Sequence, residues 1–218
     1  MAANSGHFTV AERLSKGKDA RARLPRSRHA GWSPDERAAS PLALLAEQAE
    51  TRIPELVPIR YGRMAASPFA YYRGAALPMA ADLATRAHTG LAVQLCGDAH
   101  LSNFGGFASP ERDMVFDVND FDETLPGPFE WDVKRLAASL EIAARGRNFS
   151  TKKAHSIVAD GVRSYRTAIR TFAAQPNLAV WYARLDVELA MQRWGVNADK
   201  KLVNRVGRNV ARAQIKDQ

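Results

Sequence analysis

The spacing of apolar residues predicts helices over most of the chain. Between residues 151 and 172 apolar side chains recur every three or four positions, which is typical of one face of an amphipathic helix. Gly74 and Pro78 predict a break or kink within one of the other helical segments. The remaining segments with helical spacing are 41–50, 53–64, 67–83, 129–145, 178–194 and 198–215.

A different pattern between residues 90 and 128 predicts short strands. Residues 91–96 form a short apolar run that is typical of a buried strand. Residues 104–108 and 114–118 flank a turn-forming Ser-Pro-Glu-Arg-Asp segment and therefore predict a β-hairpin, while Pro-Gly-Pro at 126–128 ends the region. We expect a mostly helical α+β fold in which a small β-hairpin and its loops carry the polar chemistry.

The chain of 218 residues is long enough to bury a sizeable core as one domain. Residues 1–32 are polar and basic and lack periodic apolar positions, so we interpret them as a flexible arm and residues 33–218 as a single domain. Much of the net charge of +8 lies near the two ends of the chain. Neither end carries a DNA- or RNA-binding motif, so we interpret these charges as solvated surface and do not expect a nucleic-acid partner.

The sequence also indicates the cellular compartment in which the protein is expected. The amino terminus has no apolar core of signal-peptide length, and no run approaches the length of a membrane-spanning helix. The single cysteine excludes an intramolecular disulfide and a cysteine-rich zinc site. We therefore expect a cytoplasmic protein without a membrane partner. The sequence leaves its oligomeric state open.

The candidate chemistry lies in the loop at 97–104 and in the acidic segment at 117–123. Asp98 stands five positions before Asn103, directly after the predicted strand at 91–96. Phosphoryl transfer from a nucleotide needs a carboxylate beside the attacking hydroxyl, together with amide and carboxylate oxygens that hold Mg²⁺. The alternative is purely structural, because Asp and Asn also satisfy the backbone donors of turns.

These motifs carry a resemblance to known enzymes. The sequence GDAHLSN at 97–103 resembles the G-D-x-H-x-x-N loop of aminoglycoside and choline phosphotransferases, which belong to the protein-kinase-like superfamily. DFD at 120–122 resembles the magnesium-binding segment of that superfamily, and WDVKRLA at 131–137 resembles the helix that follows it. The resemblance implies a kinase-like catalytic lobe.

The same resemblance implies a role for each matching residue. Asp98 would accept or orient the proton of the acceptor hydroxyl. Asn103 and Asp120 would bind Mg²⁺ through side-chain oxygens, with Asp117 and Asp122 as alternatives to Asp120.

Two further residues would support the loop. His100 would shape it by packing and hydrogen bonding, and Asp132, near a helix start, would accept its backbone donors.

Three arginines have two equally good interpretations. Arg60, Arg63 and Arg73 have forked donors that suit phosphate groups, and Arg63 or Arg73 could replace the ATP-binding lysine of a kinase. They could equally form ion pairs with acids such as Glu55 or Asp82.

Over nearly its whole length the chain resembles a bacterial family, domain of unknown function 2252. The residues that carry this resemblance are 57–64, 67–69, 72–74, 97–104 and 119–123. The chain shows no glycine-rich phosphate-binding loop, and no lysine between Lys18 and Lys134. Because such parts are needed by kinase-like enzymes, we expect a nucleotide-clamping lobe beyond Gln218 and a partial domain here.

The sequence therefore predicts a magnesium-dependent phosphotransferase that uses ATP or a related nucleotide and a small-molecule acceptor. The missing lysine and glycine-rich loop favour an alternative, a non-catalytic interaction or regulatory protein with the same fold.

Overall fold

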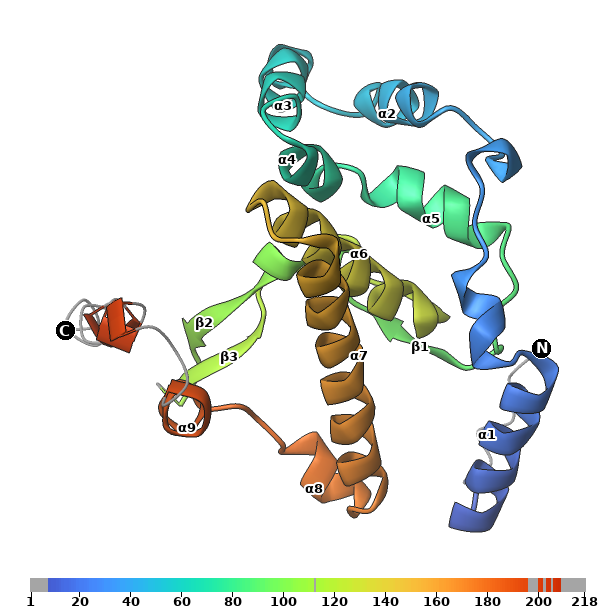
Figure 1. Cartoon of the computed structure of the whole chain (residues 1–218), viewed down its shortest axis with the longest axis vertical. Coiled ribbons are helices and arrows are strands. Elements are labelled where there is room, and N and C mark those ends of the chain that lie inside the picture. The colour runs from blue at the N-terminus through green and yellow to red at the C-terminus, as the bar shows by residue number, and fades with distance from the viewer. Residues whose placement is uncertain (1–7, 112, 196–199, 202, 205, 209–218) are drawn as a thin grey trace.

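The computed structural model describes residues 8–111, 113–195, 200–201, 203–204 and 206–208. Helices dominate these residues, and the strands form two small antiparallel sheets, which confirms the mostly helical α+β class (Figure 1). The helix predicted at 198–215 lies largely outside the described residues.

The α-helices follow the predicted segments closely in the middle of the chain. Their bounds are α1 Val10–Arg23, α2 Pro41–Ala49, α3 Val57–Met64, α4 Pro68–Arg73, α5 Ala76–Ala84, α6 Glu130–Gly146, α7 Thr151–Ala173, α8 Asn177–Trp181 and α9 Val187–Trp194. Three short 3₁₀ turns lie between α-helices, η1 Arg26–Ala30, η2 Pro34–Glu36 and η3 Pro54–Leu56, and η4 Leu101–Asn103 lies in the strand region.

The predicted hairpin is confirmed. Strand β2 (Phe104–Ala108) pairs with β3 (Met114–Val118), with Phe104 opposite Val118. The other sheet pairs β1 (Ala92–Leu95) with β4 (Leu125–Pro128), so the Pro-Gly-Pro segment is a strand rather than only an end signal. A two-stranded sheet tolerates these prolines because each strand has a free edge.

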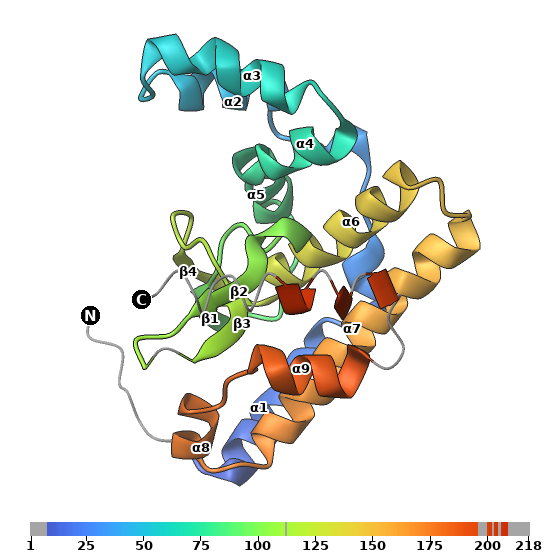
Figure 2. The same cartoon turned by 90° about the vertical axis from the view of Figure 1, so that its left-hand side faces the viewer.

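Helix α6 organises the packing of the site. It lies between α4 and α5 on one side and α7 on the other, as Figures 1 and 2 show. Small residues let α6 and α7 approach closely, since a Cβ added to Gly161 would lie 2.8 Å from the Leu140 side chain. Ser139 on α6 and Ala154 on α7 are completely buried, and the Ser139 hydroxyl accepts the Leu101 amide at 2.9 Å. The charged first turn of α6 is thereby held next to the loop at 97–103.

Two segments differ from the sequence prediction. The basic segment 1–32 contains α1, whose start is a capping box in which Thr9 and Glu12 satisfy each other's donors. The helix predicted at 178–194 is divided into α8 and α9, because the chain between them pairs with β3: the Phe116 amide donates to the Leu185 carbonyl at 2.8 Å. None of the helices among the described residues has the length and apolar composition needed to cross a membrane.

Candidate functional site

The loop at 97–103 leaves β1 through a turn that only glycine accommodates. Gly97 has a φ of 84°, in the left-handed region that other residues rarely adopt. A Cβ at this position would lie 1.8 Å from the carbonyl oxygen of Glu123. The loop and the end of the acidic segment are therefore in direct backbone contact.

Asp132 fixes the start of this loop from α6. Its two carboxylate oxygens accept hydrogen bonds from the amides of Cys96, at 2.7 Å, and Gly97, at 3.1 Å. Burial raises the pKa of Asp132, and the two amide donors act in the opposite direction. The residue therefore positions the loop rather than facing the cavity described below.

Asp98 is held by a buried arginine that the sequence analysis did not single out. Nε and Nη2 of Arg135 lie 2.7 and 2.6 Å from the same Asp98 oxygen. Arg135 is only 2% exposed, and it also donates to the Tyr72 carbonyl at 2.7 Å. Its guanidinium carbon stacks 4.1 Å from the centre of the Tyr72 ring. Arg135 follows Asp132 by three positions, so helical spacing could have placed it on the loop-facing side of α6.

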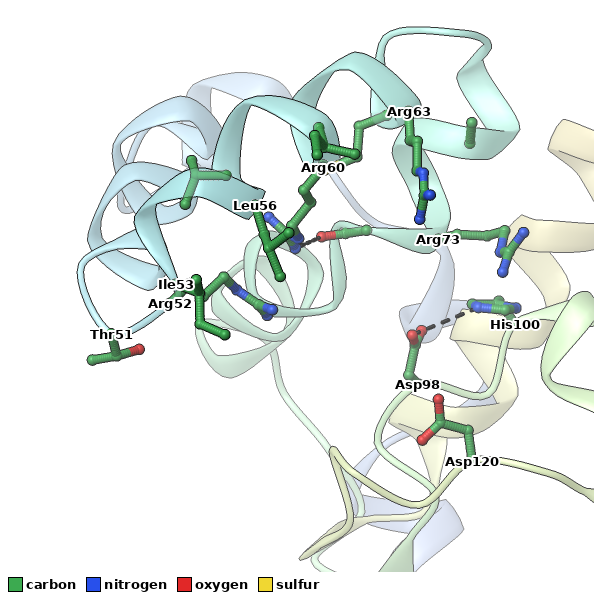
Figure 3. A pocket seen from close by; sticks show the side chains of 15 residues that line it. Thr51, Arg52, Ile53, Leu56, Arg60, Arg63, Arg73, Asp98, His100 and Asp120 are labelled. Atoms are coloured by element: carbon green, nitrogen blue, oxygen red, sulfur yellow. Dashed lines mark hydrogen bonds and ion pairs between the residues drawn. The ribbon is translucent and has the colours of Figure 1, made fainter.

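His100 lies beside the same carboxylate. Its Nε2 is 3.6 Å from the second oxygen of Asp98, as the dashed line in Figure 3 marks, and its ring packs edge-on against Phe69. Nδ1 is buried without a hydrogen-bond partner among the described residues. Burial lowers the pKa of His100, and the nearby charges of Arg135 and Arg73 add to this, whereas Asp98 opposes it.

Asn103 connects the loop to the acidic segment. Its buried side chain donates through Nδ2 to the carbonyl oxygens of Asp98, at 3.1 Å, and Asp120, at 3.2 Å. The Asn103 carbonyl also accepts the amide of Asn119 at 3.0 Å. Because both carbonyls face the amide nitrogen, Oδ1 lies at the opposite end of the group, and no hydrogen bond to it occurs within the described residues.

Of the three acids proposed as alternatives, only Asp120 joins Asp98 at a common cavity. Both carboxylates turn toward that space in Figure 3. One Asp120 oxygen accepts the amide of Asp122 at 3.1 Å, and Asp117 accepts the amide of Val118 at 2.8 Å. The structure thus brings Asp98 and Asp120 to one cavity, with Asn103 bound to the backbone of both. Asn103 itself, Asp117 and Asp122 lie outside the cavity lining.

The cavity has a volume of about 950 Å³ and an unusual lining. Opposite the two acids stand the guanidinium groups of Arg52, Arg60, Arg63 and Arg73 (Figure 3). Asp82, one of the two acids that the sequence offered as ion-pair partners of these arginines, instead pairs with Arg37 at 2.9 Å. Arg52 was not anticipated, since nothing in its local sequence marks it.

The donor set fits Mg²⁺ better than a softer metal. Within the residues that the structure describes, no group of three or more His, Cys, Asp or Glu side chains could hold a metal ion. Magnesium keeps several waters and is bound by one or two carboxylates together with substrate phosphates. An amide whose oxygen is directed away from the two carbonyls that its nitrogen binds, together with the Asp120 carboxylate, is compatible with that requirement.

Comparison with known proteins identifies the family. Residues 52–218 match a family described as "uncharacterized protein conserved in bacteria (DUF2252)". The chain belongs to this family. The match includes the loop at 97–103, the acidic segment and all four cavity arginines. No curated protein and no solved structure matches the chain. The kinase-like resemblance therefore stays a prediction.

Proposed function

We propose that this member of the DUF2252 family is a Mg²⁺-dependent phosphotransferase that uses ATP or a related nucleotide and a small hydroxyl- or amine-bearing acceptor. One observation carries the proposal: Asp98 and Asp120, from two separate loops, line one cavity, and the Asn103 side chain ties both loops together. Phosphoryl transfer consists mainly of positioning and charge stabilisation, which such a fixed set of oxygens supplies.

Asp98 is the proton acceptor in this scheme. One of its oxygens is held by Arg135, and the other, 3.6 Å from Nε2 of His100, would meet an acceptor hydroxyl in the cavity. The acceptor oxygen forms a bond to the terminal phosphorus as the bond from that phosphorus to the nucleotide's bridging oxygen breaks. The hydroxyl proton passes to Asp98.

Asp120 and Oδ1 of Asn103 are the residues that would hold the metal. A bound Mg²⁺ would supply neutralisation of the charge on the nucleotide phosphates. The contribution of the chain itself is geometric. Asn103 fixes the spacing of the two loops, and Asp132 fixes the start of the first one through the Cys96 and Gly97 amides.

The test is phosphate release or transfer from Mg²⁺-ATP with a panel of small alcohols and amines. Asp98→Asn should lower the rate by about 10²–10⁴-fold, and Asp120→Asn should also raise the Mg²⁺ concentration needed for half-maximal rate. Asp160→Asn, on the exposed face of α7, is the matched control and should leave the rate unchanged. Equal rates in all four proteins would refute the assignment.

The second candidate is a non-catalytic protein that keeps the same fold. The pairing of Asp98 with a fully buried arginine favours it, because such an ion pair also serves to fix a loop. The absence of lysine between Lys18 and Lys134 points the same way. A non-catalytic protein of this kind would show no change in melting temperature at millimolar Mg²⁺-ATP, whereas an enzyme that binds its nucleotide would be stabilised.

A further inference from the structure

The cavity has a positively charged side that the reaction scheme does not use. Four arginines, Arg52, Arg60, Arg63 and Arg73, form this arginine wall. They come from three places in the chain: the turn before η3, helix α3 and the last turn of α4. In Figure 3 the side chain of Arg63 extends toward Asp98, and Arg73 lies next to His100. The Arg60 guanidinium turns to the Gly74 carbonyl instead.

The acids of the cavity do not neutralise the arginine wall. Asp98 is already paired with Arg135, which lies outside the wall. In the described part of the chain, neither the Arg63 nor the Arg73 side chain makes a hydrogen bond or an ion pair, and both residues are exposed to solvent. Unpaired cations that face one concave space attract and concentrate anions there.

Hydrogen bonds hold the Arg60 side chain of the arginine wall in a fixed position. Its Nη2 donates to the Gly74 carbonyl at 2.7 Å and to the Gln48 side chain at 3.1 Å. Its Nη1 is buried and has no partner among the described residues. A buried donor without an acceptor is unfavourable, so a ligand oxygen placed there would recover that cost. Burial lowers the pKa of Arg60, and the charge of Arg52 adds to the effect.

The arginine wall lies on the acceptor side of the proposed reaction. Asp98 stands between Asp120 and the arginines in Figure 3. In the proposed function the nucleotide phosphates lie at the Asp120 end and the acceptor hydroxyl lies at Asp98. A group bound by the arginines would therefore belong to the acceptor.

We propose that the arginine wall binds a phosphate group carried by the acceptor, so that the substrate is a phosphorylated small molecule with a free hydroxyl or amine. Forked guanidinium donors match the geometry of phosphate oxygens and bind them through charge-assisted hydrogen bonds. The assignment of this group to the acceptor rests on the proposed function. The binding of phosphate by the wall does not.

Calorimetric titration of the full chain with inorganic phosphate tests the binding step. The titration is done in EDTA without nucleotide, at constant ionic strength. The double variant Arg63→Gln/Arg73→Gln should bind phosphate about tenfold more weakly or worse, because it loses two charge-assisted contacts. Arg166→Gln/Arg170→Gln removes the same charge from the exposed face of α7 and should bind as the wild type does. All four positions are exposed, so both variants are expected to fold.

A second titration, with a non-hydrolysable ATP analogue and Mg²⁺, identifies the source of the phosphate. Unchanged nucleotide affinity at saturating phosphate places the two ligands side by side and supports the proposal. Competition assigns the arginine wall to the nucleotide and overturns it, as does equal binding by the two double variants or no phosphate binding at all. Phosphate binding by a chain that binds no nucleotide would support the phosphate site and refute the phosphotransferase.

Discussion

Arg135 and Asp98 form an ion pair that connects the candidate site to the helical core, with Nη2 of the arginine 2.6 Å from a carboxylate oxygen. The arginine is almost completely buried, and it also donates to the backbone carbonyls of Tyr72, in α4, and Ala75, just before α5. A single side chain thus joins three parts of the chain that are far apart in sequence.

Replacement of Arg135 by Met should therefore be costly. Removal of one partner from a buried pair leaves an uncompensated charge, which typically costs about 3–5 kcal/mol of unfolding free energy. Urea denaturation measures the loss. The control is Arg163→Met, because Arg163 pairs with Asp160 on the exposed face of α7 and such pairs contribute about 1 kcal/mol or less. Similar losses in both variants would show that the Arg135 pair has no special role.

Asp132→Asn should destabilise the turn at Cys96 and Gly97. The carboxylate accepts both backbone amides, whereas an asparagine has one acceptor oxygen and would direct an amino group at the second donor. We expect a loss of about 1–3 kcal/mol in urea denaturation. Asp19→Asn, on the exposed side of α1, is the control and should change little. An unaffected Asp132→Asn protein would contradict the positioning role.

His100 should make stability depend on pH. Its pKa in the folded chain lies below the ordinary 6.5, chiefly because of burial, so the unfolded chain binds more protons just below that pH. The unfolding free energy should therefore fall as the pH drops from 6.5 toward the folded-state value. Arg135 and Arg73 face the ring and strengthen this effect, while Asp98 weakens it.

Denaturation at a series of pH values below 6.5 tests this dependence. His100→Gln should show a shallower decline than the wild type, because it removes the titrating group. His155→Gln removes an exposed imidazole on α7 and serves as the control. A decline of equal slope in all three proteins would exclude His100 as its source.

Gly97 and Gly90 offer a matched pair that separates backbone strain from steric clash. Both have positive φ, 84° and 77°, but a Cβ at Gly90 would meet no atom within 4 Å. Gly90→Ala should cost about 1–2 kcal/mol from the left-handed conformation alone. Gly97→Ala should cost clearly more, since its Cβ would collide with the Glu123 carbonyl. Equal losses by urea denaturation would mean that the loop can move away from the acidic segment.

Local patterns predicted the regular elements well. The hairpin of β2 and β3 has two β-rich runs and a turn signal between them, and α7 has an uninterrupted apolar period, so neighbouring residues determine both elements. Strand β4 was missed because its pairing with β1 is long-range, and two prolines in four residues are typical of a loop. The capping box at Thr9 is a sequence pattern that predicts the start of α1. It was overlooked because the segment lacks apolar periodicity.

The site was only partly predictable for a related reason. Asp98, Asn103 and Asp120 form a motif that chemistry makes recognisable from sequence. Helical spacing could place Arg135 on the loop-facing side of α6 but could not predict its burial, because a charged residue in an amphipathic helix is normally at the surface. Its burial follows from the packing of α4 and α5 over α6, which depends on tertiary contacts rather than on its neighbours in sequence.

Leu95 pairs with Leu125, so the segment 96–124 begins and ends at neighbouring positions of the β1–β4 sheet. Both acids of the cavity lie in this segment, and the Asn103 side chain hydrogen-bonds to the backbone carbonyls of both. Opening of the short β1–β4 ladder, together with loss of the contacts that Arg135 and Asp132 make to the first loop, would release the two carboxylates. The backbone amides of segment 96–124 are expected to exchange their hydrogens with solvent as one cooperative unit. The two carboxylates would then be either both in place or both displaced.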